Sequence, residues 1–418
     1  MKASRYATSR QKACLHCSTA KAKCDRKANR CTRCTLRGLS CTYPQKSPVE
    51  RPAHPTSHNG NPVSSFSTSS QDSTVGSAQS IDSASPANTS STTFTGSQIP
   101  EDPRLNDMSY LPTNMVTPEF SDLELSCPIN VDDIRNRWLN SYVPVPGQKV
   151  KSYPPSITAF IYKILKSYAG ITVRGRGVPP FVHASQLAPE STRPPLSTCL
   201  TLVRICEKPL PGSETAAADV LQREMNVLYD QHATYDDTAL LAAFQAYLIY
   251  SIVLFFKLDH GASPFLRQAM TNLQDLACST SRRGLVCTAE QQRARPRWEA
   301  WVVAEVKRRA LFVMYLFDSM LLAQDGLPTF FGTELEGLPA PASRALWKAG
   351  SRQAWEAAYN VHLADWSQGL RIDELWPIPA QLDDSGVLER RRRVDRWLEE
   401  VDEFGTMLYA VTSCTHGG

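Results

Sequence analysis

Apolar residues recur at helical spacing along most of the chain, from Pro128 onward. No stretch there alternates strictly between apolar and polar residues, as a half-buried strand would. Pro-rich breaks at 144–155, 179–195 and 209–212 separate the apolar runs. The pattern therefore predicts an all-α domain. The predicted helices cover residues 130–142, 156–169, 197–207, 213–233, 237–257, 263–279, 290–323, 351–369 and 387–411.

One of these runs, residues 238–256, contains no formally charged residue and approaches the length of a membrane span. Gln245 and Ser251 interrupt it, and charged residues bracket it. The centre of a large helical domain also needs a helix that is apolar on all sides. We therefore favour a buried core helix and no membrane partner, with a membrane span as the alternative.

The composition changes sharply between positions 47 and 100, where Ser and Thr dominate and large apolar side chains are rare. Such a segment cannot bury enough apolar surface to offset its loss of chain entropy. We expect a disordered linker over residues 47–126. Acidic and apolar residues interleave over 101–125, which is compatible with an activation segment or with plain linker. No heptad pattern is visible, so dimerisation is left to the helical domain or is absent.

Charge is distributed unevenly along the chain. Residues 1–46 contain twelve Lys and Arg and one acidic residue, a net +11, whereas the remainder has 33 basic against 40 acidic residues, a net −7. A short, strongly basic segment on a mildly acidic body is typical of a chain that binds a polyanion at one end. Nucleic acid is the first candidate partner.

Six of the twelve cysteines lie in this basic segment, at positions 14, 17, 24, 31, 34 and 41. The last three repeat the spacing of the first three, at one constant offset along the chain. The N-terminus has no apolar stretch that could act as a secretory signal, so a reducing location is expected and disulfides are disfavoured. Iron–sulfur spacings do not match the doubled pattern. The array therefore indicates zinc bound by thiolates.

The number of ligands sets the form of the zinc site. Two tetrahedral Zn²⁺ ions need eight ligand positions, and six thiolates supply them only if two cysteines each bridge both ions. His16, inside the first Cys-x2-Cys pair, is expected to point outward rather than to act as a ligand. The predicted domain is a small, loop-rich binuclear cluster with two short helices, and its six ligands are Cys14, Cys17, Cys24, Cys31, Cys34 and Cys41.

Residues 12–43 resemble the fungal Zn(II)2Cys6 binuclear cluster DNA-binding domains, through Lys12-Ala13-Cys14, Lys21-x-Lys23-Cys24-Asp25 and Cys41-Thr42-Tyr43. The resemblance implies that Cys14 and Cys31 bridge the two metal ions. It also implies that a helix between the second and third cysteines enters the major groove, commonly at a CGG triplet. Lys21 would then read a base and Lys23 would contact a phosphate.

The residues themselves show a compatible asymmetry. Residues 18–23 carry Lys21 and Lys23, whereas the equivalent residues 35–40 carry one arginine beside Leu36 and Leu39. We therefore expect the first half to face DNA and the second to pack. Lysine is a favoured donor to guanine in the major groove, and the surrounding basic residues suit phosphates. These predicted phosphate contacts are Lys12, Arg26, Lys27, Arg30 and Arg33, with plain solvated surface charge as the alternative.

The helical region shows no catalytic motif: it has no HExxH, no Gly-rich phosphate loop and no GxSxG. We therefore expect no enzyme. Residues 298–318, with the stretch that follows to Trp355, resemble the middle homology region of fungal transcription factors, which implies a regulatory role. Four consecutive arginines, 390–393, suggest either a solvated helix face, which we favour, or a second nuclear-import signal.

Together these features predict three parts: a zinc-cluster DNA-binding domain (1–46), a disordered linker (47–126) and an all-α regulatory domain (127–418). The expected function is a nuclear, sequence-specific regulator of RNA polymerase II genes that binds double-stranded DNA and the transcription machinery. The chain also looks like regulators of fungal secondary-metabolite gene clusters, with activation favoured over repression. The main alternative is a zinc-stapled interaction module that binds an acidic protein or RNA.

Overall fold

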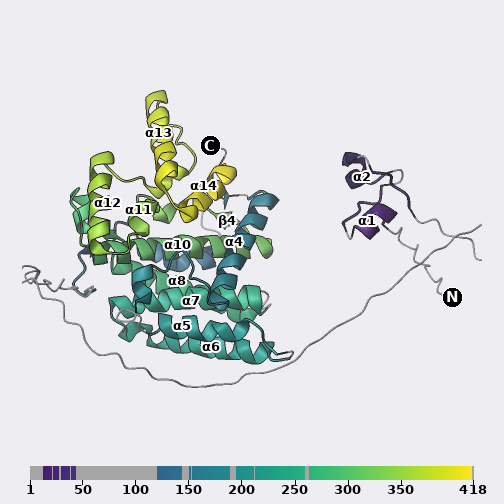
Figure 1. The fold of residues 1–418 in the computed structure, drawn as a ribbon, viewed down its shortest axis with the longest axis horizontal. Helices are drawn as coiled ribbons and strands as arrows, with labels where there is room; N and C mark the ends of the chain where they lie inside the picture. Colours follow the sequence, from purple (N-terminus) through teal and green to yellow (C-terminus); the bar gives the residue numbers. More distant parts are fainter. Residues whose placement is uncertain are drawn as a thin grey trace, which may run out of the picture. The chain divides into compact units, whose positions relative to one another are not determined.

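The computed structural model describes residues 13–20, 22–27, 30–37, 39–43, 120–143, 150–151, 153–188, 194–210, 212–258 and 263–416. The chain divides into two compact units, residues 1–106 and residues 107–418 (Figure 1). The described part of the first unit contains two short helices, α1 (Leu15–Thr19) and α2 (Thr32–Leu36). Residues 47–119 of the predicted linker, with most of the predicted activation segment, lie outside the described residues.

The second unit is mainly helical, which confirms the prediction from apolar spacing. Its α-helices are α3 (Val131–Asn140), α4 (Pro155–Val173), α5 (Leu196–Leu202), α6 (Glu214–Gln231), α7 (Asp237–Lys257), α8 (Pro264–Arg282), α9 (Thr288–Gln291), α10 (Trp298–Gln324), α11 (Arg344–Trp347), α12 (Arg352–Asp365), α13 (Asp384–Glu400) and α14 (Glu403–His416). Its 3₁₀ turns are η1 (Ala184–Leu187), η2 (Val203–Cys206), η3 (His232–Thr234), η4 (Thr333–Leu335) and η5 (Ile372–Leu375).

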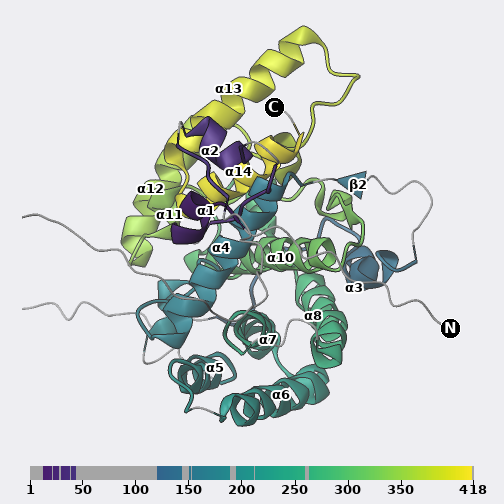
Figure 2. The same cartoon turned by 90° about the vertical axis from the view of Figure 1, so that its right-hand side faces the viewer.

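Helix α7 lies inside this unit, with α4, α5, α6, α8 and α10 packed around it (Figure 2). It is long and apolar enough to cross a membrane, but most of its residues are buried by the surrounding helices. The two polar residues that interrupt its apolar run bond within the protein. The amide of Gln245 donates to the carbonyl of Phe181 at 2.6 Å, and the hydroxyl of Ser251 donates to the carbonyl of Tyr247 at 2.9 Å. Burial in the helical core thus accounts for the composition of α7.

Helix α10 runs through two hydrophobic clusters. Its first half packs with Leu346, Trp355 and Tyr359, and its second half joins the main core around α7. A row of charged residues in its middle, Glu305, Lys307, Arg308 and Arg309, is also buried. Each of these charges has a partner, because an unpaired charge would be very costly there. The ammonium of Lys307, for example, donates to the carbonyl of Gly284 at 3.0 Å.

Two small antiparallel sheets were not predicted. Strand β1 (Leu125–Ser126) pairs with β3 (Val286–Cys287), and β2 (Val150–Lys151) pairs with β4 (Thr329–Phe330). Strands this short cannot show alternation. Near the first pair, Phe120, Leu123 and Leu125, at the end of the segment predicted as linker, pack against the first half of α10.

Two of the predicted helices are each broken in two. The predicted helix 290–323 is divided into α9 and α10, because Arg293 adopts a left-handed backbone (φ 56°) and Pro296 has no N–H to donate. The predicted helix 387–411 is divided into α13 and α14. There Val401 is extended, and the carboxylate of Asp402 accepts the amide of Gly405 at 3.1 Å, which caps the new helix.

Candidate metal centre

The two halves of the cysteine array fold in the same way. Cys14 and Cys31 each have an extended backbone (φ −64°, ψ 155° and φ −71°, ψ 148°) and each stands immediately before a short helix. The amide of Ser18 donates to the carbonyl of Cys14 at 2.9 Å, and at the equivalent place in the second half Thr35 donates to Cys31 at 3.0 Å. The internal repeat of the sequence is therefore also a repeat in backbone structure.

A second pair of hydrogen bonds fixes the chain after each helix. The amide of Ala22 donates to the carbonyl of Cys17 at 2.8 Å, and that of Leu39 donates to Cys34 at 3.0 Å. These turns direct the chain back toward Cys24 and Cys41, so that each Cys-x2-Cys pair meets its third cysteine. The helices themselves begin after the first cysteine of each half and contain the second. This differs from the expected helix between the second and third cysteines.

The six sulfurs gather into two overlapping groups. Cys14, Cys17, Cys24 and Cys31 form one, and Cys14, Cys31, Cys34 and Cys41 form the other; within each group the sulfurs all lie within 4.8 Å of one another. The sulfurs of Cys14 and Cys31, which both groups contain, are 3.8 Å apart. Four sulfurs at such spacing suit a tetrahedral soft-ligand metal site.

Backbone hydrogen bonds lower the pKa of Cys24 and Cys41, which each belong to only one of the two sulfur groups. The amide of Cys31 donates to Sγ of Cys41 at 3.3 Å and holds the pKa of that thiol below its usual range. The equivalent backbone hydrogen bond from Cys14 lowers the pKa of Cys24 to about 6. Both interactions favour the thiolate, which is the form that binds zinc.

The central sulfurs behave differently. A backbone hydrogen bond from Cys17 lowers the pKa of Cys14, but burial and the neighbouring thiols outweigh it and raise the pKa to about 12. The pKa of Cys31 is raised in the same way: a hydrogen bond from the amide of Cys34 opposes the shift, while burial and adjacent thiols cause it. Crowded thiolates repel one another, so a cation among them is needed to hold all of these sulfurs deprotonated. The donor set therefore fits zinc.

Two contacts join the halves outside the sulfur cluster. The carboxylate of Asp25, in the first half, accepts the amide of Thr32 at 3.0 Å and its hydroxyl at 2.6 Å, at the start of α2. The Thr32 hydroxyl is the main reason that the pKa of Asp25 is lowered. The amide of Leu15 donates to the carbonyl of Thr42 at 2.8 Å and closes the two ends of the domain. The spacing of the cysteines did not predict the contact between Asp25 and Thr32.

The predicted DNA-contacting residues fall into three groups. Lys23, Arg26 and Lys27 are exposed, as a nucleic-acid contact requires. Arg30 and Arg33 also make contacts within the domain: Arg30 donates to the carbonyl of Leu39 at 2.9 Å, and Arg33 lies with Nη1 3.8 Å from Sγ of Cys17. Lys12 and Lys21 lie outside the described residues.

The expected packing of the second half is only partly right. Leu39 packs against the cluster of buried cysteines, but Leu36 is 81% exposed within this unit, because it stands on the outer face of the short helix α2. His16 is exposed and is absent from both sulfur groups. Tyr43 also packs against the cluster, with its hydroxyl 3.9 Å from Sγ of Cys24.

Residues 12–49 match the family model of the fungal Zn(2)-Cys(6) binuclear cluster domain. This domain binds zinc, and the family is typically one of fungal DNA-binding transcription regulators, usually nuclear, rather than of enzymes. Searches of the curated proteins and of the solved structures found no match to this chain. The resemblance of residues 298–355 to the middle homology region stays a prediction.

Proposed function

We propose that this chain is a nuclear, sequence-specific DNA-binding transcription factor of RNA polymerase II genes. The observation that carries the proposal is the pair of four-sulfur groups that share Cys14 and Cys31, set in a segment of net charge +11. The sulfur groups supply a metal-stabilised scaffold, and the basic residues supply a surface for a polyanion. The family match over residues 12–49 supports the same function.

The cluster would hold two Zn²⁺ ions, one in each sulfur group, with Cys14 and Cys31 bridging them. A count of bound zinc tests this arrangement. We expect two ions per chain, at most one after Cys24→Ser, and loss of both after Cys14→Ser, since that thiol belongs to both groups. Equal loss from the two variants would contradict the bridging role of Cys14.

The DNA-reading surface would be the first half of the domain. Lys21 follows α1 in the sequence, and Lys23 is exposed. By resemblance to the family, Lys21 would donate to guanine in a CGG-like site, and Lys23, Lys12, Arg26, Lys27, Arg30 and Arg33 would contact phosphates. The internal bonds of Arg30 and Arg33 leave other guanidinium N–H groups for this purpose.

The helical unit would regulate output and contact the transcription machinery, and any homodimer would form through it. The chain would act as a regulator, with activation favoured, of a fungal secondary-metabolite gene cluster. Transcript profiling after deletion of the gene tests this assignment. Unchanged transcripts from every such cluster would overturn it while leaving the DNA-binding proposal intact.

Selection of random duplex DNA by the zinc-loaded full chain tests the DNA-binding proposal directly. We expect a CGG-containing motif, and Lys21→Ala should weaken binding by about 1–3 kcal/mol and relax the preference at one position. Arg37→Ala, an exposed arginine at the end of α2 in the other half, is the matched control and should keep the preference. Recovery of unselected sequence would favour the alternative, an interaction module for an acidic protein or RNA.

A further inference from the structure

The helical unit contains a cavity that the proposed DNA-binding function does not use. It has a volume of about 450 Å³ and is lined by residues of α9, α10, α12, α13 and the segments 339–346 and 366–371. This volume falls within the range of small-molecule sites in proteins. The cavity is therefore large enough for a ligand of two or three fused rings.

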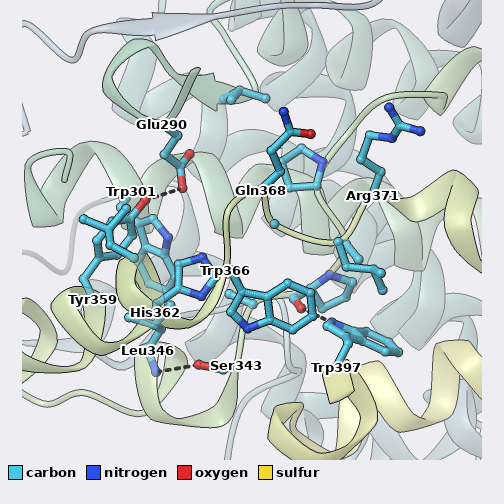
Figure 3. A pocket seen from close by; sticks show the side chains of 18 of the residues that line it. Glu290, Trp301, Ser343, Leu346, Tyr359, His362, Trp366, Gln368, Arg371 and Trp397 are labelled. Atoms are coloured by element: carbon cyan, nitrogen blue, oxygen red, sulfur yellow. Dashed lines mark hydrogen bonds between the residues drawn. The ribbon is translucent and has the colours of Figure 1, made fainter. Parts of the chain in front are cut away.

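Aromatic side chains form one wall of the cavity. Tyr359, His362 and Trp366 follow one another along and just beyond the end of α12, and Trp301 and Trp397 also line the space (Figure 3). The ring centroids of Tyr359 and His362 are 5.5 Å apart with planes inclined by 58°, and those of His362 and Trp366 are 6.3 Å apart with planes inclined by 28°. A lining this rich in aromatic rings favours contact with an aromatic ligand, which can pack against them face to face or edge to face.

Most polar groups of the cavity already have partners within the protein. Glu290 accepts the hydroxyl of Tyr359 at 3.2 Å, and Glu400 accepts the indole N–H of Trp366 at 3.0 Å. Arg308, a buried residue of the lining, bonds to Glu305 at 2.8 Å. The carboxylates thus hold the aromatic wall in place and balance the nearby arginines, so the lining gives no strong preference for a charged ligand.

Two buried nitrogens of the lining differ from the rest. Among the described residues, Nε of Arg308 and Nδ1 of His362 have no hydrogen-bond partner. Burial also lowers the pKa of His362, so its ring is neutral near pH 7. A buried donor without an acceptor costs about 1–3 kcal/mol, and a ligand oxygen that reached it would recover part of this.

We propose that this cavity is a binding site for a neutral, planar aromatic molecule that carries a carbonyl or phenol oxygen. The aromatic side chains pack against the ring system, and the unpaired nitrogens of Arg308 and His362 bond to the oxygen. The site lies wholly within the helical unit, so ligand binding does not depend on the proposed DNA-binding function.

The mouth of the cavity is held by α13. Arg393 donates to the carbonyls of Gln368 and Gly369 at 3.3 and 3.1 Å, and it pairs with Glu374 at 2.8 Å. Arg393 is thus a positioning residue for the segment 367–371, which forms one lip of the opening. A ligand that moved the segment 367–371 would therefore also disturb its hydrogen bonds to Arg393 of α13.

Ligand-observed NMR and calorimetry with the zinc-loaded full chain test the proposal, with 2-naphthol as the probe. We expect saturable binding of one molecule per chain. Decahydro-2-naphthol, which keeps the oxygen but is not planar, and naphthalene, which lacks the oxygen, should each bind at least about tenfold more weakly, a difference of about 1.4 kcal/mol. Equal binding of all three compounds would show nonspecific hydrophobic association and would overturn the proposal.

Variants locate the bound probe. Gln368→Trp places a bulky side chain on the exposed lip and should reduce 2-naphthol affinity about tenfold or more. Ala364→Trp, at an exposed position of α12 outside the lining, is the matched control and should bind like the unmodified chain. His362→Phe keeps an aromatic ring but removes both ring nitrogens, so it should weaken 2-naphthol more than naphthalene. Unchanged affinity in Gln368→Trp, or no binding of 2-naphthol to the folded chain, would overturn the assignment.

Discussion

Arg309 of α10 forms an ion pair with Asp402, which stands far along the chain between α13 and α14, with Nη1 2.7 Å from Oδ2. Both side chains are buried. The guanidinium also bonds to Glu305 at 2.6 Å and lies over the ring of Trp347 at 3.9 Å. The other oxygen of Asp402 caps α14 through Gly405. Asp402 therefore connects the junction of α13 and α14 to α10.

Replacing Asp402 tests how much the buried pair contributes. Asp402→Asn keeps an oxygen for the cap but leaves the Arg309 charge short of a partner, so we expect a loss of about 3 kcal/mol in unfolding free energy. Asp402→Ala removes the cap as well and should cost about 1 kcal/mol more. All eight tryptophans lie between positions 138 and 397, so tryptophan fluorescence during urea unfolding reports on the helical unit.

The control is an exposed ion pair on α13. Arg392 and Glu389 are 2.7 Å apart, and their side chains are 69% and 57% exposed. Solvent screens such pairs, so Arg392→Ala should change the unfolding free energy by less than about 0.5 kcal/mol. A cost for Asp402→Asn as small as this control would mean that the buried pair is not needed to hold α14.

The run of four arginines on α13 gives a second prediction. Arg390 donates to the carbonyls of Asp373, Glu374 and Trp376 at 2.8, 2.9 and 2.6 Å, at the end of η5, whereas Arg391 is exposed. Arg390→Ala should therefore cost about 2 kcal/mol because it leaves these carbonyls without a strong donor. Arg391→Ala, the neighbouring control, should be nearly neutral in the same urea experiment. If Arg390→Ala were as nearly neutral as Arg391→Ala, the arginine run would behave as the solvated helix face that the sequence predicts.

Those arginines show why part of the fold escaped prediction. The sequence presents four identical residues, and helical spacing correctly places them on a helix. Their separate roles depend on where η5 lies, and a contact between positions 376 and 390 leaves no mark in the local pattern. The same holds for Arg309 and Asp402, which are far apart in the sequence and meet only in the fold.

Local features were more predictable. The six cysteines proposed as zinc ligands all lie between positions 14 and 41, and tetrahedral metal geometry requires such ligands to meet, so their spacing alone predicted the observed grouping of sulfurs. Helix α7 was predicted at its observed bounds because a long apolar run has clear ends, with Asp236 as the cap. Helix breaks at Arg293 and Val401 were missed, because backbone conformation and capping there override continuous apolar spacing.

The aromatic cavity could not be predicted from the sequence either. Its rings come from α10, α12 and α13, and any single tryptophan at helical spacing is more simply interpreted as core. Several of them are core: Trp355 packs fully buried beside Trp301. Only the tertiary arrangement leaves space beside Tyr359 and Trp366.

His183 gives a prediction about pH. Its Nε2 bonds to the carbonyl of Trp347 at 3.0 Å, and its Nδ1 accepts the amide of Ser185 at 3.2 Å, so the folded state needs the neutral ring. Burial, with the nearby charge of Arg309, lowers the pKa of His183 to about 4. The unfolded chain then binds the proton more readily, and stability falls as pH drops from about 6.5 toward 4.

Between pH 7 and pH 5 this group should remove about 2 kcal/mol of unfolding free energy. Other groups titrate in the same range, so the measurement is the difference between the unmodified chain and His183→Asn, which can still accept the Ser185 amide. We expect the variant to lose less stability on acidification by about this amount. Parallel pH profiles for the two proteins would contradict the role of His183.

Asp25 gives the last prediction, which concerns zinc affinity. Its carboxylate binds both the amide and the hydroxyl of Thr32, and so holds the start of α2, with Cys31 and Cys34, against the first half. Groups that orient metal ligands typically change metal affinity by about 10–100-fold, so Asp25→Ala should weaken zinc binding by about tenfold or more in competition with a chromophoric chelator. Lys27→Ala removes only the exposed charge 3.9 Å from Asp25 and should leave zinc affinity unchanged. If Lys27→Ala weakened zinc binding as much as Asp25→Ala, the effect would come from net charge; with the expected difference, zinc binding depends on the hydrogen bonds that join the two halves.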